Sequence, residues 1–310
     1  MSQDPPQGDW QGWDAQPQQP YPYPYPYPQQ VGFDPADPLV SNDFNGWWQR
    51  SFRLLKAAWR PMALIQLIVS LPTLVLLLPA MLAFQDEQRV AQESLQASVD
   101  AGTQPDFSLF FAGLTVLLPA AAVAGLFYML GQLANQQVVV FTATGRTGNL
   151  VGPALLAAAK RLPMLLGWYL LAIPVLIVAT VLCFFPVFYV GAALTVLAVV
   201  VLLERGNGIG RCFQLFHASI GVSVARIATI FGLSVGASLL LTLVTTLVDV
   251  TLGGSYTTPN STATVINTLL QTAYYAVSYV VLAPLLVTTY ADMRARREPF
   301  TTASLLPGTA

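Results

Sequence analysis

Few side chains in this sequence are of a type that could carry out chemistry. The chain has 310 residues but only one histidine, His217, and two cysteines, Cys183 and Cys212. A metal site usually draws several ligands from His, Cys, Asp and Glu at a recognisable spacing, and no such spacing occurs in the sequence. Acid–base or nucleophilic catalysis also needs several converging groups. We therefore expect a protein that is not an enzyme and that holds neither a cofactor nor a metal ion.

One carboxylate lies inside a long apolar run. Asp249, in the stretch LVDVTLGG, is surrounded by aliphatic residues, and ionisable residues within membrane spans are functional candidates by default. Its position close to the end of the run leaves two interpretations open, a functional carboxylate or one at the membrane interface. The stretch RGNGIGR (205–211) lacks the preceding strand that a dinucleotide-binding loop requires. We interpret it as the end of one helix and the start of the next.

Long apolar runs dominate the rest of the sequence. Hydrophobic residues make up 55% of the chain and charged residues 9%, against about 25% charged residues in a typical soluble domain. Six runs have about the length that crosses a hydrocarbon core of about 30 Å. They lie at about 61–84, 107–131, 162–184, 186–203, 225–251 and 264–290. The sequence therefore predicts an all-α integral membrane protein with six transmembrane helices.

Two features refine these spans. The second span is expected to continue as a helix to about residue 143 and to stop near Gly145, which places Asn135, Gln136 and Gln137 at or beyond the inner interface. The stretch CFFP (183–186) is expected to form a tight outer turn between the third and fourth spans. Phe184, Phe185, Phe188 and Tyr189 would then form an outer aromatic belt.

The basic residues predict the orientation. Thirteen of the 14 lysines and arginines fall on one side of the predicted spans, and only Arg89 falls on the other. Because cytoplasmic loops are rich in Lys and Arg, we expect a multi-pass protein of the plasma membrane with both termini in the cytoplasm. Cys183 and Cys212 then lie on opposite sides of the membrane, too far apart for a disulfide.

An amphipathic segment precedes the first span. In SNDFNGWWQRSFRLLKAAWR (41–60), aromatic and aliphatic residues recur on one helical face and basic residues gather on the other. This pattern is typical of a helix in the cytoplasmic headgroup region, with its cations toward anionic lipid. The expected interface residues, including those of a later copy of the pattern, are Trp48, Arg50, Phe52, Arg53, Lys56, Trp59, Arg60, Arg211, Phe213 and Phe216.

The same basic and aromatic pattern returns twice. RSFRLLKAAWR (50–60) aligns with RCFQLFHASIG (211–221), which places His217 at the position of Lys56, and more weakly with GPALLAAAKRLPMLLGW (152–168). Each copy precedes a pair of spans. Because periodicity at this scale is a fold-level signal, the sequence predicts three repeats, each an interfacial helix followed by a helical hairpin.

Three regions are expected along the chain: a cytoplasmic tail at 1–42, a six-helix membrane domain at 43–298, and a short cytoplasmic tail at 299–310. The first tail is rich in Pro, Gln, Tyr and Asp and poor in aliphatic residues, a composition typical of disorder. Its run QPYPYPYPYPQQ is either a plain spacer or a weak aromatic binding segment for a protein partner. The tyrosines of this run are Tyr21, Tyr23, Tyr25 and Tyr27.

The ending PLLVTTYADMRARREPF (284–300) contains the pattern Tyr-x-Asp-x-Arg at Tyr290, Asp292 and Arg294. Together with the six spans and the helix RSFRLLKAAWR, it resembles a group of bacterial, especially actinobacterial, membrane proteins. That group is often catalogued with the membrane domain of glycerophosphoryl diester phosphodiesterases. The resemblance covers about residues 43–300. It implies a membrane module without the separate barrel domain that carries the catalytic histidines, carboxylates and metal in those phosphodiesterases.

Two functions remain open from the sequence. The first is a non-enzymatic integral membrane protein that acts as a scaffold or tether through its cytoplasmic tail. The alternative is a transporter or lipid-handling protein, favoured by the helical repeat and by the prolines within the spans. The expected partners are a bilayer with anionic headgroups and a cytoplasmic protein, without nucleic acid. The sequence predicts no oligomeric state.

Overall fold

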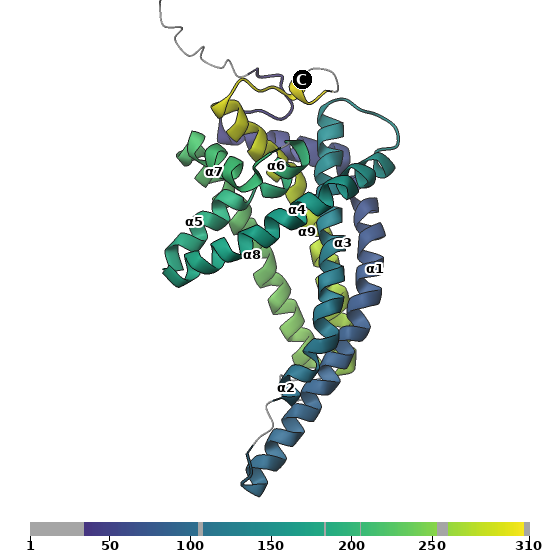
Figure 1. Cartoon of the computed structure of the whole chain (residues 1–310). Coiled ribbons are helices and arrows are strands. Elements are labelled where there is room, and N and C mark those ends of the chain that lie inside the picture. The colour runs from purple at the N-terminus through teal and green to yellow at the C-terminus, as the bar shows by residue number, and fades with distance from the viewer. Residues whose placement is uncertain (1–33, 105–107, 183, 205, 253–259, 307–310) are drawn as a thin grey trace, which may run out of the picture. The chain divides into compact units, whose positions relative to one another are not determined.

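The computed structural model describes residues 34–104, 108–182, 184–204, 206–252 and 260–306 (Figure 1). Within these residues all regular structure is helical and no strand occurs. The helices are α1 (Phe44–Ala101), α2 (Leu109–Ala112), α3 (Leu114–Ala143), α4 (Val151–Leu182), α5 (Phe184–Leu194), α6 (Leu197–Leu203), α7 (Gly208–Ala218), α8 (Ile220–Thr251), α9 (Ser261–Arg297) and the 3-10 helix η1 (Thr302–Leu305). The prediction of an all-α protein is confirmed.

Six helical stretches are long and apolar enough to cross a membrane. They are α1, α3, α8, α9, most of α4 (Val151–Val181), and the stretch Pro186–Leu203 that includes α6 and most of α5. Helix α8, with 32 residues, is about 48 Å long at 1.5 Å per residue, which exceeds a hydrocarbon core of about 30 Å. The chain is a multi-pass integral membrane protein, as predicted.

Helix α1 is longer than the sequence predicted, with 58 residues. It contains the expected interfacial segment, the first span and the residues up to Ala101, so the boundary expected near residue 60 is not a helix end. Pro61 removes one backbone donor, but the Leu, Ala and Met residues around it favour a helix. Figure 1 shows that the first turns of α1 run across the direction of the rest of the helix, a bend typical of an internal proline.

Only the third expected interfacial segment is a separate helix. Helix α7 begins after Asn207, whose side chain accepts the Gly210 N–H at 3.0 Å, and ends before Ser219. The interpretation of RGNGIGR as the end of one helix and the start of the next is confirmed. The second expected segment continues into α4 past Pro163. The three-fold repeat therefore stays a prediction.

Helix α3 ends where the sequence predicted. Its last residue is Ala143, and Gly145 then takes a φ of 74°, a conformation that favours glycine at helix ends. Two polar side chains near this end of α3 are enclosed by protein. Asn135 and Gln136, expected at or beyond the inner interface, are fully buried in the protein.

The sequence predicts that the turn between the third and fourth spans carries Tyr189 to the outer end of the helices. The structure instead places Tyr189 beside α7. In Figure 1 α4 runs obliquely to α3, and the returning chain is divided into α5 and α6. The hydroxyl of Tyr189 on α5 lies 2.8 Å from Nε2 of His217 on α7. Tyr189 therefore lies beside α7, so it cannot belong to an outer aromatic belt if α7 lies at the cytoplasmic interface, as the sequence predicts.

The apolar core contains residues of α1, α3, α6 and α9. Helix α6 is almost fully enclosed, because Leu197–Leu202 are at most 5% exposed. Helix α8 by contrast exposes large aliphatic side chains such as Leu239, Leu240 and Leu243. Lipid chains are as apolar as leucine, so such faces can contact the lipid of a bilayer without an energetic cost.

Helices α1 and α3 approach each other closely at Gly131. A Cβ atom added to Gly131 would lie 2.8 Å from Cγ2 of Val69 and 3.0 Å from Nε2 of Gln66. Small residues allow such close helix contacts in membrane proteins. The glycine is therefore required by the packing of these two helices.

We expect Gly131→Leu to destabilise the protein by about 1–3 kcal/mol, the usual cost of overpacking a core. The matched control is Gly125→Leu on the same helix, because a Cβ atom at Gly125 meets no atom within 4 Å. Thermal unfolding of both variants in detergent measures the difference. Equal midpoints for the two variants would contradict a close contact at Gly131.

Candidate functional site

The residues directly before α1 belong to the folded domain, in contrast to the prediction of a tail that extends to residue 42. Leu39, Val40 and Ser41 are buried. The segment 34–43 has few aliphatic residues, which is why its composition resembles that of a disordered tail. Its order depends instead on polar groups, which bond to α1, to α9 and to the chain after α9.

Asp37 joins this segment to the C-terminal segment. Its Oδ1 accepts the Thr302 hydroxyl at 2.6 Å and the N–H groups of Leu39 and Val40 at 2.8 Å, and its Oδ2 accepts the Thr302 N–H at 2.7 Å. Arg50 donates to the Asp37 carbonyl oxygen at 2.8 Å. Burial by itself would raise the pKa of the Asp37 carboxyl, but the hydrogen bonds to its oxygens outweigh burial and lower the pKa below the ordinary 3.8. We name Asp37, Thr302 and Arg50 the Asp37 clamp.

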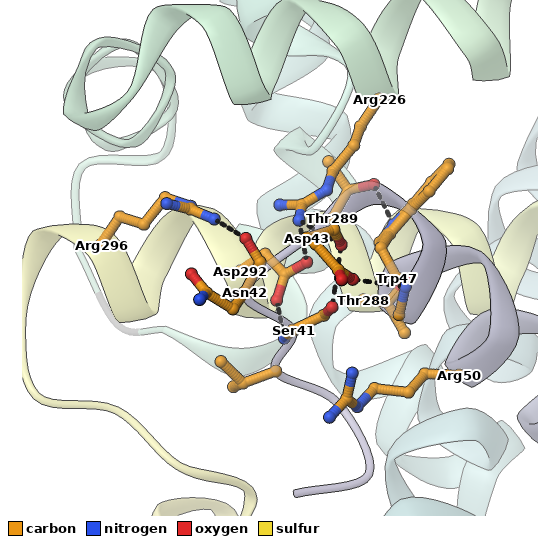
Figure 2. Close-up of polar contacts among 12 residues, drawn as sticks. Ser41, Asn42, Asp43, Trp47, Arg50, Arg226, Thr288, Thr289, Asp292 and Arg296 are labelled. Carbon is orange, nitrogen blue, oxygen red and sulfur yellow. Dashed lines mark hydrogen bonds and ion pairs between the residues drawn. The ribbon is translucent and has the colours of Figure 1, made fainter. Parts of the chain in front are cut away.

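A buried ion pair links α8 to α9 (Figure 2). Nη2 of Arg226 on α8 lies 2.8 Å from Oδ2 of Asp292 on α9, and the two side chains are 1% and 0% exposed. The backbone N–H of Ser41 donates to the other oxygen of Asp292. Arg226 also donates to the carbonyl oxygen of Asp43 at 3.5 Å and lies over the ring of Trp47. We name these five residues the Asp292 network.

Hydrogen bonds between α1 and α9 extend this network. The indole N–H of Trp47 donates to the Thr289 hydroxyl at 3.1 Å, and the hydroxyls of Ser51 and Thr288 lie 2.8 Å apart. Figure 2 shows Trp47, Thr288 and Thr289 gathered around the ion pair. The start of α1 is thus fixed to the last turns of α9.

A second group of charges surrounds the end of α6. It consists of Glu204, Arg211, Tyr290, Arg294 and Glu298, which we name the Glu204 network. Arg211 donates to Glu204 and to Glu298, both at 2.7 Å, while the Tyr290 hydroxyl donates to Glu204 at 2.6 Å. Arg294 donates to the Tyr290 oxygen at 2.9 Å and pairs with Glu298. Burial alone would raise the pKa of Glu298, but the hydrogen bonds and charges of Arg294 and Arg211 lower it.

A cavity of about 250 Å³ lies beside this network. Its lining includes Glu204, Arg211 and the glycine-rich turn that precedes α7. Both charged side chains of the lining already pair with each other. The cavity therefore adds no unpaired charge to the network.

Half of the predicted membrane-interface residues lie on the exposed side of α1. They are Phe52, Arg53, Lys56, Trp59 and Arg60. Their exposure leaves these side chains accessible to lipid headgroups. The headgroup contact itself stays a prediction.

The side chains of the other predicted interface residues contact other parts of the protein through ion pairs, hydrogen bonds or apolar packing. Arg211 pairs with two carboxylates, and Phe216 is buried in the core. Ion pairs and apolar packing already occupy these two side chains, so little of either is left for a lipid headgroup. Trp48 and Phe213 are partly buried against the core, and Arg50 belongs to the Asp37 clamp.

The remaining candidates do not converge on one site. Asp249 on α8 accepts a hydrogen bond from the Asn267 amide on α9 at 2.8 Å and so links two helices. Cys212 is buried, and burial raises the pKa of its thiol to about 12, which favours a packing role. Cys183 lies outside the described residues, as do the tyrosines Tyr21, Tyr23, Tyr25 and Tyr27.

Asp37, Glu204, Arg226 and Glu298 were not predicted from the sequence as site residues. One signal was available in the ending Tyr-x-Asp-x-Arg, since each of its three residues takes part in one of the two networks. A second signal was Arg226, a charged residue close to the start of the apolar fifth span. A charge within a membrane helix almost always has a partner inside the protein.

Comparison with known proteins shows no relative. No family model, no curated protein and no solved structure matches the chain. The resemblance to the phosphodiesterase-associated membrane domain therefore stays a prediction.

The pairing of the charged groups determines what the two networks can do chemically. The carboxylates of both networks are occupied by arginine, tyrosine or backbone donors. Within the described ranges, no group of three or more His, Cys, Asp or Glu side chains could hold a metal ion. The arrangement acts as a polar lock that holds the two ends of the described chain, α6, α7 and α8 together.

We expect Asp292→Leu to destabilise the protein by about 3–5 kcal/mol, because it leaves the buried Arg226 charge without its partner. The double variant Arg226→Met with Asp292→Leu removes both charges and should recover most of the loss. Arg53→Met, at an exposed position of α1, is the control and should leave the thermal midpoint unchanged. A double variant as unstable as Asp292→Leu would contradict the ion pair as the cause.

We expect Asp37→Ala to release residues 34–43 from the C-terminal segment. At pH 7, hydrogen–deuterium exchange should become faster for the amides of Leu39, Val40 and Thr302, which lose their acceptor. Asp34→Ala is the matched control, because the Asp34 carboxylate accepts the Ala36 N–H within its own exposed turn, while the backbone bond from the Asp37 N–H to the Asp34 carbonyl is kept in the variant.

The same clamp should respond to pH. Since the folded-state pKa of Asp37 lies below 3.8, its carboxylate stabilises the clamp fully above pH 3.8, and this stabilisation is lost as the pH falls further. Exchange of these amides, corrected for the intrinsic rate, should rise over that range in the wild type but not in Asp37→Ala. Identical rates in both proteins at every pH would overturn the role of Asp37.

Proposed function

We propose that this protein is a non-enzymatic membrane anchor that holds residues 1–33 at the cytoplasmic face of the plasma membrane, where they bind a protein partner. The observation that carries the proposal is the fixation of residues 34–43. Asp37 bonds to Thr302, Ser41 bonds to Asp292, and Arg296 donates to the carbonyl oxygen of Asn42 at 2.9 Å.

The energetics of this fixation support a role for the segment. Ordering the backbone of one residue costs about 1–2 kcal/mol, and this segment buries few aliphatic side chains that would offset the cost. A plain flexible spacer needs no such fixation. A segment fixed to both α9 and the C-terminal segment instead gives residue 34 one defined position on the membrane domain.

The exposed face of α1 supports the placement at a membrane surface. Arg53, Lys56 and Arg60 are exposed on this helix together with Phe52 and Trp59. Cations of this kind attract anionic headgroups, while aromatic rings lie at the interface. With the basic residues on the cytoplasmic side, both termini of the chain lie in the cytoplasm.

The chemistry of the tail favours a protein partner. In the run from Pro20 to Pro28 each tyrosine stands between two prolines, and prolines favour an extended polyproline conformation. Tyrosine offers a large amphipathic contact area at low conformational-entropy cost. On this proposal the chain is a membrane module of the kind that its resemblance implies, without a catalytic unit.

The test is proximity labelling from an enzyme fused to the C-terminus of the full chain. We expect deletion of residues 2–33 to remove a set of cytoplasmic proteins from the labelled fraction, because the tail that binds them is gone. Replacing Tyr21, Tyr23, Tyr25 and Tyr27 by serine should remove the same set if the aromatic rings make the contact. The thermal midpoint and membrane insertion of both variants serve as folding controls.

The labelled fraction also separates the two functions predicted from the sequence. If deletion of residues 2–33 removes no protein, the anchor proposal fails. Flux of a solute or lipid in vesicles that contain the protein, above the flux in empty vesicles, would then favour the transporter or lipid-handling alternative.

A further inference from the structure

A groove of about 580 Å³ lies between α5 and α8, with α3 and α9 also contributing to its lining. This volume is within the range of about 300–1,000 Å³ that is usual for ligand sites. One wall comes from α5 and includes Val187, Phe188 and Gly191. The other wall comes from α8 and includes Ala228 and Phe231.

The groove has a buried floor and exposed edges. Ile227, Ile230 and Leu286 in its lining are buried, whereas Phe188 and Phe231 are 51% and 58% exposed. Both walls belong to stretches that are long and apolar enough to cross a membrane. The groove therefore opens sideways, into the apolar layer that surrounds these helices, and not into water.

The hydroxyl groups of the lining favour an apolar occupant. Thr195 donates to the carbonyl oxygen of Gly191 at 2.9 Å, and Ser234 donates to that of Ile230 at 2.9 Å. These hydroxyl protons are thus bonded to the protein and are not presented to a ligand. Gln132 contributes the one side-chain amide among the lining residues, which are otherwise almost all apolar.

The length of the groove matches one leaflet of a bilayer. Along α8 its lining runs from Val224 to Ser234, which is about 15 Å at 1.5 Å per residue. Half of a hydrocarbon core of about 30 Å is also about 15 Å. The groove begins near the start of α8, where α7 lies, and so it spans the leaflet on the side of α7.

Two polar side chains lie close to the lining, next to Phe188 in the chain and on α7. Tyr189 follows the edge residue Phe188, and its hydroxyl bonds to His217 on α7. Both side chains are exposed. Tyrosine is enriched at membrane interfaces because its ring is apolar and its hydroxyl is polar.

We propose that the groove between α5 and α8 binds one acyl chain of a glycerophospholipid from the leaflet on the side of α7, with the headgroup beside Tyr189 and His217. In the orientation predicted from the basic residues, this is the cytoplasmic leaflet. The site is independent of the tail, so it stands whether or not the tail binds a protein.

The test uses the full chain in nanodiscs of phosphatidylglycerol and phosphatidylethanolamine. A trace of phosphatidylcholine carries a photoactivatable diazirine near the end of one acyl chain. After irradiation and digestion, mass spectrometry locates the label. We expect the label to concentrate on residues 187–195 and 224–234, and to be depleted on the exposed stretch 239–250 of α8, which does not line the groove.

Two tryptophan substitutions three residues apart provide a matched pair. Ala228→Trp fills the groove and should abolish the label on its walls. Ala225→Trp places the same side chain at an exposed position outside the lining and should leave the label in place. Gly191→Phe fills the groove from the opposite wall, so the test holds even if Ala228→Trp fails to fold, as its thermal midpoint would reveal.

Three results would overturn the proposal. The first is a label spread evenly over all exposed apolar helix faces. The second is equal labelling of the groove in Ala228→Trp and Ala225→Trp. The third is labelling of the groove by a diazirine-bearing fatty acid as strongly as by the phospholipid. That result would assign the groove to free fatty acids.

Discussion

The buried ion pair of Arg226 and Asp292 is the constraint on which the rest of the arrangement depends. Moving a charge out of water costs several kcal/mol per ion even after relaxation, so a buried charge needs its partner and further hydrogen bonds. Arg226 Nε and Nη1 have no hydrogen-bond acceptor among the described residues, which leaves Asp292 as the main compensation for its charge. Asp292 in turn accepts a hydrogen bond from the Ser41 N–H. Three segments far apart in the sequence must therefore assemble together, and the residues before α1 cannot be omitted from the fold.

Helix α9 combines the two networks through the spacing of its polar residues. At 3.6 residues per turn, positions two apart are separated by about 200° around a helix and positions four apart by about 40°. Tyr290 and Arg294 thus share one face, where they bond within the Glu204 network, while Asp292 points to the other side, toward α8 and Ser41. A pattern of three residues accordingly gives one helix two opposite polar faces. One face holds α6 and α7, and the other holds α8 and the N-terminal segment.

This geometry explains which features could be predicted from the sequence. The spans and the end of α3 follow from apolar length and from Gly145, which are local signals. The boundary at residue 42 was wrong because composition measures aliphatic content, whereas Asp37 and Ser41 are ordered by Thr302 and Asp292, more than 200 residues away. Arg211 was assigned to the membrane surface because its helix resembles the start of α1, but the sequence does not reveal that Glu204 and Glu298 flank it in space. Pairing between distant charges is the part of the candidate site that local patterns do not contain.

Polar contacts are concentrated at the end of the described helices near α7, which we call the stiff end. The opposite end has few such contacts, and we call it the compliant end. In a bilayer apolar faces gain little by packing on one another rather than on lipid, so close backbone contacts and polar bonds hold the helices together. Most ion pairs of the described residues lie around the end of α9, whereas toward the other end α8 and α9 are linked by the Asn267–Asp249 bond and expose much aliphatic surface. The groove between α5 and α8 begins near the stiff end and opens sideways along α8. A lipid chain in that groove would therefore lie against α8, whose end near α7 is fixed by the polar lock through Arg226, while its lipid-facing surface remains free to adjust.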